Sequence, residues 1–164
     1  MSEKFIVRKA EKNDIAEIQT LIKGLATYEK RPQDMTASQE DLCYWIFEKK
    51  IATVLIAEYN EEIIGYAIYY PIFGSFAAEA GVHLEDVLLN EKYRHCGLGR
   101  KFFSKIEEFV KEDGYSKMEW SCLAVDFRVR TNFRKHSLRN VEDFQNLIIP
   151  FKILDVIEHS TSCV

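Results

Sequence analysis

The 22 residues from Ala52 to Phe73, ATVLIAEYNEEIIGYAIYYPIF, constrain the fold more than any other stretch of the chain. Two runs rich in β-branched and aromatic residues, Val54–Tyr59 and Ile63–Tyr70, are separated only by Asn60-Glu61-Glu62. Runs of this composition joined by so short a connection are typical of a β-hairpin. We therefore expect an antiparallel pair of strands, and the remaining segments must cover the sheet to which it belongs.

A helical pattern precedes the hairpin. Apolar residues recur at spacings of three and four from Ile15 to Leu25, which predicts one face of a helix that ends near position 28. Asn13 and Asp14 offer a cap at the start of this helix, and Glu17 lies three residues after Asp14. The proline at position 32 prevents its continuation, because a residue before proline is disfavoured in helical geometry.

Further elements complete the predicted order. Ser38 offers the cap of a second helix, and a third is expected from Gly97 to Gly114, where the apolar residues share one stripe. Further strands are expected over Phe5–Val7, Val82–Leu89 and Lys117–Leu123, with a loop over Pro71–Gly81. This order indicates an α/β fold with a mixed, mostly antiparallel central sheet flanked by helices. A length of 164 residues fits one domain, 1–164.

Composition argues against several classes of function. The net charge is −4 and the pI is near 5.6, whereas nucleic-acid binders usually present basic patches, so no nucleic-acid partner is expected. No run approaches the length of a membrane span, and the polar start lacks the apolar stretch of a signal peptide, so no membrane association is expected. The four cysteines form no C-x-x-C pair and the four histidines are scattered, which favours a cytoplasmic protein without a metal site or disulfide framework.

The stretch YRHCGLGRKFF, Tyr93–Phe103, joins an expected strand to an expected helix. Backbone N–H groups at a helix start lack intrahelical partners, and glycines let that backbone approach a ligand closely. Such a loop suits phosphate or pyrophosphate, with Arg94 and Arg100 as further contacts. Its spacing matches neither a P-loop nor the dinucleotide fingerprint. On these residues alone, a helix that merely starts at a glycine is an equally good interpretation.

A wider pattern carries a resemblance to a known family. The run Arg94–Gly99 matches R-x-x-G-x-G, and its arginine lies eight positions after Asp86 of the Leu84-Glu85-Asp86 triplet. Together with IVRKAEKND, LIKGLATYEK and GYAIYY, this arrangement resembles the GNAT superfamily of acetyltransferases, and within it the diamine (spermidine/spermine) N-acetyltransferase branch. The resemblance runs from about Phe5 to Leu123, and it implies the GNAT acyl-CoA N-acyltransferase fold.

The resemblance implies that acetyl-CoA is the co-substrate, and the spacing of cysteines and histidines already argues against a metal. The backbone of the strand end would pair with the pantetheine arm, as an added strand does, and the loop after it would hold the pyrophosphate. Cys96 has no evident base partner, so we expect a loop residue there and not a nucleophile. The implied cofactor-binding residues are Val87, Leu88, Leu89, Arg94, His95, Cys96, Gly97, Leu98, Gly99 and Arg100.

The resemblance also places Tyr28, Glu29 and Glu85 at the site of a small amine substrate. An alkylamine arrives protonated and must lose a proton before it attacks a thioester, so Glu85 is expected to accept that proton through a water molecule. Glu29, Glu85 and Asp86 would also attract a cationic substrate, although neighbours on a strand face opposite sides, which weakens the case for Asp86. The alternative without a function is that Glu85 and Asp86 are a solvated surface pair and that Tyr28 and Glu29 only end a helix.

The resulting prediction is an acetyl-CoA-dependent N-acetyltransferase that acts on a primary amine of a small diamine or polyamine. Two alternatives stay open. One is an acetyltransferase for another amine, such as an amino acid or a lysine-like side chain. The other is a non-catalytic acyl-CoA-binding remnant.

Residues 124–164 depart from the family pattern. All seven glycines and all eight tyrosines precede this tail, whereas four of the eight arginines fall within Arg128–Arg139. The tyrosine that the family places near the leaving thiolate has no counterpart there, and the last two strands are hard to find. A divergent tail, a reading-frame change near Ala124 and the loss of catalysis are competing explanations. Family members commonly dimerise through C-terminal strands, so the homodimer also stays open.

Overall fold

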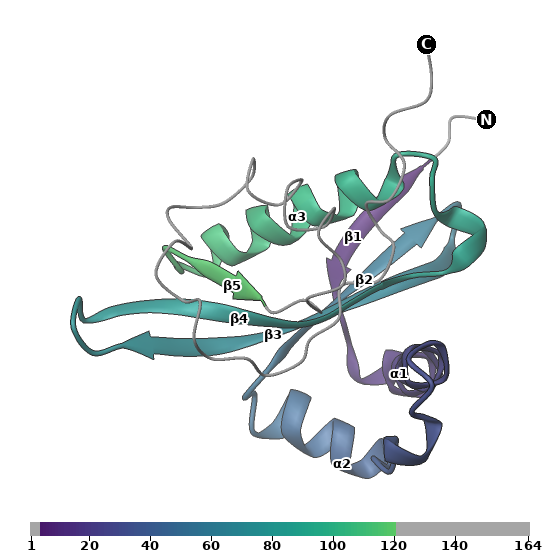
Figure 1. The fold of residues 1–164 in the computed structure, drawn as a ribbon, viewed down its shortest axis with the longest axis horizontal. Helices are drawn as coiled ribbons and strands as arrows, with labels where there is room; N and C mark the ends of the chain where they lie inside the picture. The colour runs from purple at the N-terminus through teal and green to yellow at the C-terminus, as the bar shows by residue number, and fades with distance from the viewer. Residues whose placement is uncertain (1–3, 121–164) are drawn as a thin grey trace.

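The computed structural model describes residues 4–120, and within them five strands form one open sheet in the order β1-β2-β3-β4-β5 (Figure 1). Strands β1 to β4 are antiparallel to their neighbours, whereas β5 is parallel to β4. The expected mixed, mostly antiparallel sheet is therefore confirmed, while residues 121–164 lie outside the described part. The strands are β1 (Phe5–Lys9), β2 (Thr53–Tyr59), β3 (Glu62–Gly74), β4 (Glu79–Leu89) and β5 (Met118–Trp120).

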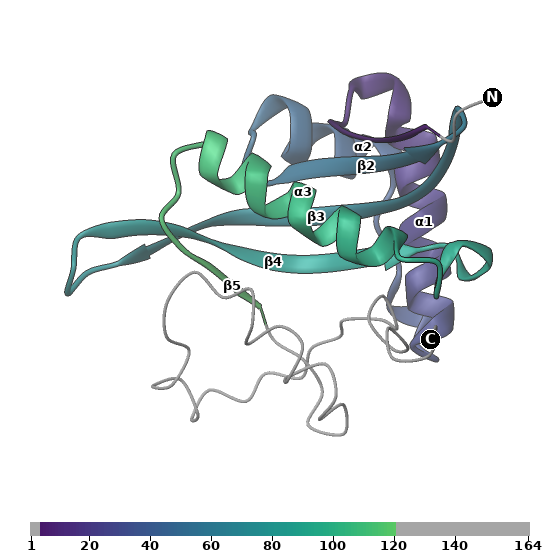
Figure 2. The same cartoon turned by 90° about the horizontal axis from the view of Figure 1, so that it is seen from above.

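Helices cover both faces of this sheet. Helix α3 (Leu98–Glu112) lies on one face, and α1 (Ile15–Tyr28) and α2 (Gln39–Cys43) lie on the other (Figures 1 and 2). Helix α2 continues as a π-helical turn over Tyr44–Glu48. None of the helices in residues 4–120 is both long enough and apolar enough to cross a bilayer.

The sheet separates two apolar layers, because successive residues of a strand point to opposite faces. Against α3, the fully buried Phe102 and Ile106 pack on side chains of β2, β3 and β4. Against α1, the fully buried Ile18 packs with Ile56 and Tyr66. Burying one large apolar side chain stabilises a fold by roughly 1.5–3 kcal/mol, so these layers hold α1 and α3 on opposite faces.

The β3–β4 hairpin is longer than the sequence predicts. We expected a loop over Pro71–Gly81, and that prediction is wrong, because the pairing continues to Gly74 opposite Glu79. The hairpin therefore projects past the helices in both views (Figures 1 and 2). Pro71 fits because β2 pairs with β3 only as far as Tyr69, which leaves an edge strand beyond it, and proline is compatible with an edge.

The starts of α1 and α2 are formed differently. Ser38 caps α2 as expected, since its hydroxyl accepts a hydrogen bond of 3.0 Å from the N–H of Asp41. Asp14 occupies the N-cap position of α1 as expected, but its side chain makes no capping hydrogen bond. Its carboxylate accepts hydrogen bonds from the guanidinium of Arg8 (2.7 and 2.9 Å) and from the N–H of Glu11 (2.7 Å). Asp14 therefore ties β1 to the start of α1.

Candidate functional site

A β-bulge places two adjacent carboxylates of β4 on the same face of the sheet. The pairing passes from Ile68 opposite Asp86 to Tyr69 opposite Leu84, so Glu85 is an extra residue in β4. Regular alternation would send Glu85 and Asp86 to opposite faces, but a bulge interrupts that alternation. Both carboxylates contact tyrosines of β3, and the alternation argument against Asp86 therefore does not apply.

Two tyrosines of β3 hold these carboxylates. The hydroxyl of Tyr66 donates to Oδ2 of Asp86 (3.2 Å), and the hydroxyl of Tyr70 donates to Oε2 of Glu85 (3.3 Å). Burial, followed by the charge of the carboxylate that each one contacts, raises the pKa of both tyrosines above its usual value. Both hydroxyls therefore stay protonated and act as donors. The Glu85 side chain remains 37% exposed, so it can also reach a ligand.

The end of α1 meets this part of β4. The charge of Glu29 contributes to the raised pKa of Tyr66, after burial and the neighbouring carboxylate of β4, which places Glu29 near that hydroxyl. The ring centre of Tyr28 lies 5.3 Å from the guanidinium carbon of Arg94, in a cation–π contact. The predicted substrate residues of α1 thus lie beside the predicted cofactor loop and near the two carboxylates.

A histidine lies next to Glu85. His83 precedes Glu85 by two residues, and its ring stacks on that of Tyr70 with centroids 5.3 Å apart. Its Nε2 lies 3.9 Å from Oε2 of Glu85, and its Nδ1 lies 3.5 Å from Oε1 of Glu119 on β5. The imidazole therefore lies between carboxylates of two strands. No three His, Cys, Asp or Glu side chains in the described part of the chain are arranged to hold a metal ion.

Strands β4 and β5 pair only over a short distance. β5 runs beside Val82–Leu84, and within residues 4–120 no strand follows β4 on that side from Glu85 to Leu89. The side chains of Val87, Leu88 and Leu89 are buried, so a ligand alongside this edge would meet the backbone. The Nε of Arg94 donates to the carbonyl of Leu89 (2.9 Å), which fixes the following loop to the strand end.

The loop enters α3 through left-handed backbone. Gly97 has φ 83°, and nothing lies within 4 Å of where its Cβ would be. His95 also has a positive φ of 63°. Since the first four N–H groups of an α-helix have no intrahelical partner, a helix start reached through an open glycine suits an anionic ligand.

The other predicted loop residues divide into buried and exposed positions. Leu98 and Gly99 are buried in the first turn of α3, whereas Cys96 and Arg100 are exposed. The thiol of Cys96 donates to the carbonyl of Tyr93 (3.1 Å), a contact within the loop. These positions agree with a role for Cys96 in shaping the loop, and they give Arg100 access to a ligand.

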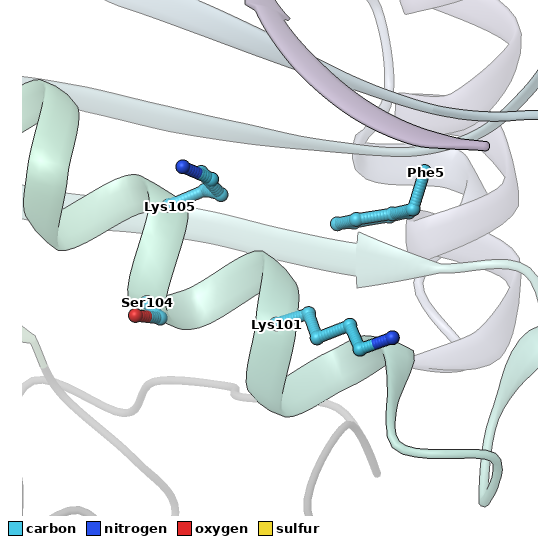
Figure 3. A pocket seen from close by; sticks show the side chains of 4 residues that line it. All are labelled: Phe5, Lys101, Ser104 and Lys105. Atoms are coloured by element: carbon cyan, nitrogen blue, oxygen red, sulfur yellow. The ribbon is translucent and has the colours of Figure 1, made fainter.

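A separate pocket lies between β1 and α3 (Figure 3). It has a volume of about 400 Å³, and none of the predicted site residues lines it. Its polar lining is cationic or neutral, which is unsuited to a protonated amine. The lining residues are Phe5, Lys101, Ser104 and Lys105.

Sequence reasoning did not single out four side chains of the acidic site. Tyr66 and Tyr70 lie four apart on β3, and His83 lies two before Glu85, spacings that put residues on one strand face. This periodicity could have predicted that the three side chains lie on the same face as the site. No sequence signal predicted that Glu119 lies near His83, because that contact depends on the parallel pairing of β5 with β4.

Comparisons with known proteins find similar acetyltransferases. The sequence profile of the Acetyltransferase (GNAT) family matches residues 15–136. The thialysine N-epsilon-acetyltransferase of Sus scrofa is 28% identical over 135 residues, covering 74% of this chain and 79% of that protein. The spermidine/spermine N(1)-acetyltransferase-like protein 1 of Homo sapiens is 30% identical over 114 residues, covering 65% of this chain and 16% of that protein.

A solved structure shows the same fold. An aminoglycoside acetyltransferase from an uncultured soil metagenomic sample, crystallised with trehalose, superposes with a TM-score of 0.71 at 15% identity. The match covers 91% of this chain and 96% of that one.

Proposed function

Because this chain belongs to the GNAT acetyltransferase family, we propose that it transfers an acetyl group from acetyl-CoA to a primary amine of a small diamine or polyamine. The main support for a diamine or polyamine substrate is the grouping of carboxylates at this site. The bulge of β4 presents Glu85 and Asp86 on one face, and the end of α1 brings Glu29 to the same tyrosine that Asp86 contacts. Such a gathering of carboxylates attracts a molecule with more than one ammonium group.

The neighbouring residues fit acetyl-CoA, the co-substrate of GNAT acetyltransferases. On the side of β4 where β5 pairs with Val82–Leu84, no strand of the described residues pairs with Val87–Leu89. The backbone of Val87–Leu89 can therefore pair with the amide groups of the pantetheine arm. The loop His95–Arg100 contacts the pyrophosphate through the N–H groups at the start of α3 and through the Arg100 guanidinium. Arg94 supports this loop through its contacts with Leu89 and Tyr28.

The carboxylates have different roles in this reaction. Bound acetyl-CoA supplies the acetyl thioester that the amine attacks. Since an alkylamine has a usual pKa of about 10.4, it arrives as an ammonium ion, and Glu85 accepts the proton that it must lose. The hydroxyl of Tyr70 holds the Glu85 carboxylate in position. The carboxylates of Asp86 and Glu29 orient the second ammonium group of the substrate.

A lysine-like side chain is the second candidate substrate. It is favoured by the similarity to a protein named thialysine N-epsilon-acetyltransferase, which is 28% identical over 79% of that protein. A free amino acid also carries an α-carboxylate, which the acidic groups of this site would repel. The two candidates therefore differ in whether the site tolerates that extra negative charge.

Matched substrates test the proposal directly. Putrescine and ornithine differ only in the α-carboxylate, and so do cadaverine and lysine. Release of free thiol from acetyl-CoA should be faster with each diamine than with its amino-acid counterpart, and spermidine should also react. Faster reaction of the amino acids would move the assignment to the lysine-like class. Turnover with none of these amines, despite thermal stabilisation by acetyl-CoA, would overturn both assignments.

A further inference from the structure

We propose that His83 relays protons from Glu85 to Glu119, an inference that rests on the proposed role of Glu85 as the proton acceptor. The two ring nitrogens of His83 face carboxylates on different strands. Nε2 lies 3.9 Å from Oε2 of Glu85, and Nδ1 lies 3.5 Å from Oε1 of Glu119. The chain Glu85–His83–Glu119 thus crosses from β4, where the substrate is expected, to β5.

The surroundings of His83 fix the direction of its nitrogens. The ring stacks on Tyr70 with an interplanar angle of 29°, and the side chain is only 13% exposed. Tyr70 also donates to the same Oε2 of Glu85 that faces Nε2, so one tyrosine orients both members of the pair. Gaps of 3.9 and 3.5 Å are slightly longer than a hydrogen bond, and a small side-chain movement closes them.

The proposed reaction gives such a route a function, because bound substrate and acetyl-CoA would cover the exposed part of Glu85. Each turnover leaves one proton on Glu85, and the carboxylate must lose it before the next substrate reacts. Tyr70 cannot take this proton, because its hydroxyl already carries one and burial raises its pKa. Histidine is the side chain that both accepts and releases protons near neutral pH.

Each cycle of the relay delivers one proton from the substrate to solvent and changes only bonds to hydrogen. The proton leaves the amine nitrogen for a Glu85 oxygen, and then leaves that oxygen as the Nε2–H bond of His83 forms. The Nδ1–H bond breaks as a Glu119 oxygen takes the second proton, and Glu119 releases it to water, since its side chain is 40% exposed. Exchange with water restores the first tautomer of His83, and the net change is one proton delivered from substrate to solvent.

The titratable and charged groups around His83 in the described part come from three segments. Tyr70 faces it from β3 and Glu85 from β4. Glu119 faces it from β5, and the side chain of Lys117 packs over Gly81, two residues before His83. The imidazolium formed in transit therefore faces two carboxylates, while the ammonium end of Lys117 lies toward Gly74.

The test compares His83→Phe and His83→Ala with the wild-type enzyme in the thiol-release assay. Phenylalanine keeps a ring against Tyr70 but lacks nitrogens, so kcat should fall on the order of 10²-fold with little change in the KM for acetyl-CoA. External buffer should take over the missing step, so kcat of His83→Phe should rise with buffer concentration while that of wild type does not. Imidazole should restore kcat of His83→Ala, which leaves room for it.

Glu119→Gln should lower kcat in the same way, whereas Glu79→Gln, exposed on the distant part of the hairpin, is the matched control without effect. Unchanged kcat in His83→Phe would overturn the relay while leaving the proposed function intact. A loss of kcat that tracks lower thermal stability and does not respond to buffer would also overturn it. Failure of the wild-type protein to acetylate any amine would instead remove the proposed function, and the relay with it.

Discussion

The hydroxyl of the fully buried Tyr66 donates a hydrogen bond of 3.2 Å to Oδ2 of Asp86 across the bulge of β4. Tyr66→Phe removes this donor and leaves a partly buried carboxylate without it. We expect the free energy of unfolding, measured by urea denaturation, to fall by about 1–3 kcal/mol. Tyr44→Phe, at an exposed position, is the control and should change stability by less than about 0.5 kcal/mol. Equal stability of Tyr66→Phe and wild type would show that the hydrogen bond contributes nothing.

Buried tyrosine hydroxyls should make the folded protein sensitive to alkali. Burial is the main reason that the pKa values of Tyr66, Tyr69 and Tyr70 lie above the usual one, and a nearby carboxylate adds to it in each case. In the unfolded chain tyrosine loses its proton near pH 10, while the folded protein retains it. The unfolded chain then binds fewer protons, so stability is complete below about pH 10 and falls as the pH rises further.

Urea denaturation between about pH 8 and about pH 11 measures this fall. Replacing Tyr66 by phenylalanine should make the decline less steep, because one of the three hydroxyls is then missing. The same slope in wild type and variant would contradict the assignment of alkaline sensitivity to Tyr66.

Two glycines offer a matched test of the cofactor loop. Gly97 has φ 83°, where a Cβ is strained even though the surrounding space is open, so Gly97→Ala should lower stability by about 1–2 kcal/mol. Gly24 lies in α1 with nothing near its Cβ position, so Gly24→Ala should raise stability by roughly 0.5–1 kcal/mol. Only Gly97→Ala should weaken the thermal stabilisation by acetyl-CoA. Weakening in both variants would argue against a specific role of the loop.

Part of this site was predictable from sequence and part was not. The period of apolar residues predicted α1 and α3, and Ser38 gave the start of α2, because these signals depend only on neighbours in the chain. The position of Asp86 depends on the bulge at Glu85, which is set by how β4 pairs with β3, and strict alternation therefore assigned it to the wrong face. The length of the hairpin was missed because Pro71 suggests a loop unless the strand is known to lie at an edge.

The coding DNA downstream of Ala124 tests the competing explanations for residues 124–164. The frame-change hypothesis predicts that translating another frame downstream of Ala124 restores the family's tyrosine-containing segment. Absence of that segment from both other frames would leave a divergent tail. The family profile itself matches as far as residue 136.

Arg8 joins β1, β2 and the start of α1. Its guanidinium donates to Asp14 and to Glu58 (2.7 Å), and its hydrogen bonds to Asp14 hold the pKa of that carboxyl below the usual value. The stabilisation is therefore complete above the usual pKa of aspartate and is lost as the pH falls through the lower folded-state pKa. Because Arg8 is about one-third exposed, Arg8→Gln should cost only about 1–2 kcal/mol at neutral pH, measured by urea denaturation.

A variant of Asp14, the acidic partner of Arg8, provides the control for this prediction. Asp14→Asn cannot titrate, so Arg8→Gln made in that background should show a smaller loss and a weaker dependence on pH between about 2 and about 5. Additive losses in the double variant would mean that Arg8 and Asp14 do not stabilise the fold through each other.

Glu85→Gln is the sharpest test of the proposed chemistry, because it keeps the size of the side chain and can still accept a hydrogen bond from Tyr70. Loss of the proton acceptor should lower kcat by about 10²–10⁴-fold, the usual contribution of an acid–base group. Thermal stabilisation by acetyl-CoA should persist, since the proposed pantetheine and pyrophosphate contacts begin at Val87. Asp86→Asn should mainly raise the KM for the diamine, because it removes charge without removing the acceptor. Equal losses of turnover and acetyl-CoA binding in Glu85→Gln would assign Glu85 to the shape of β4 and not to proton transfer.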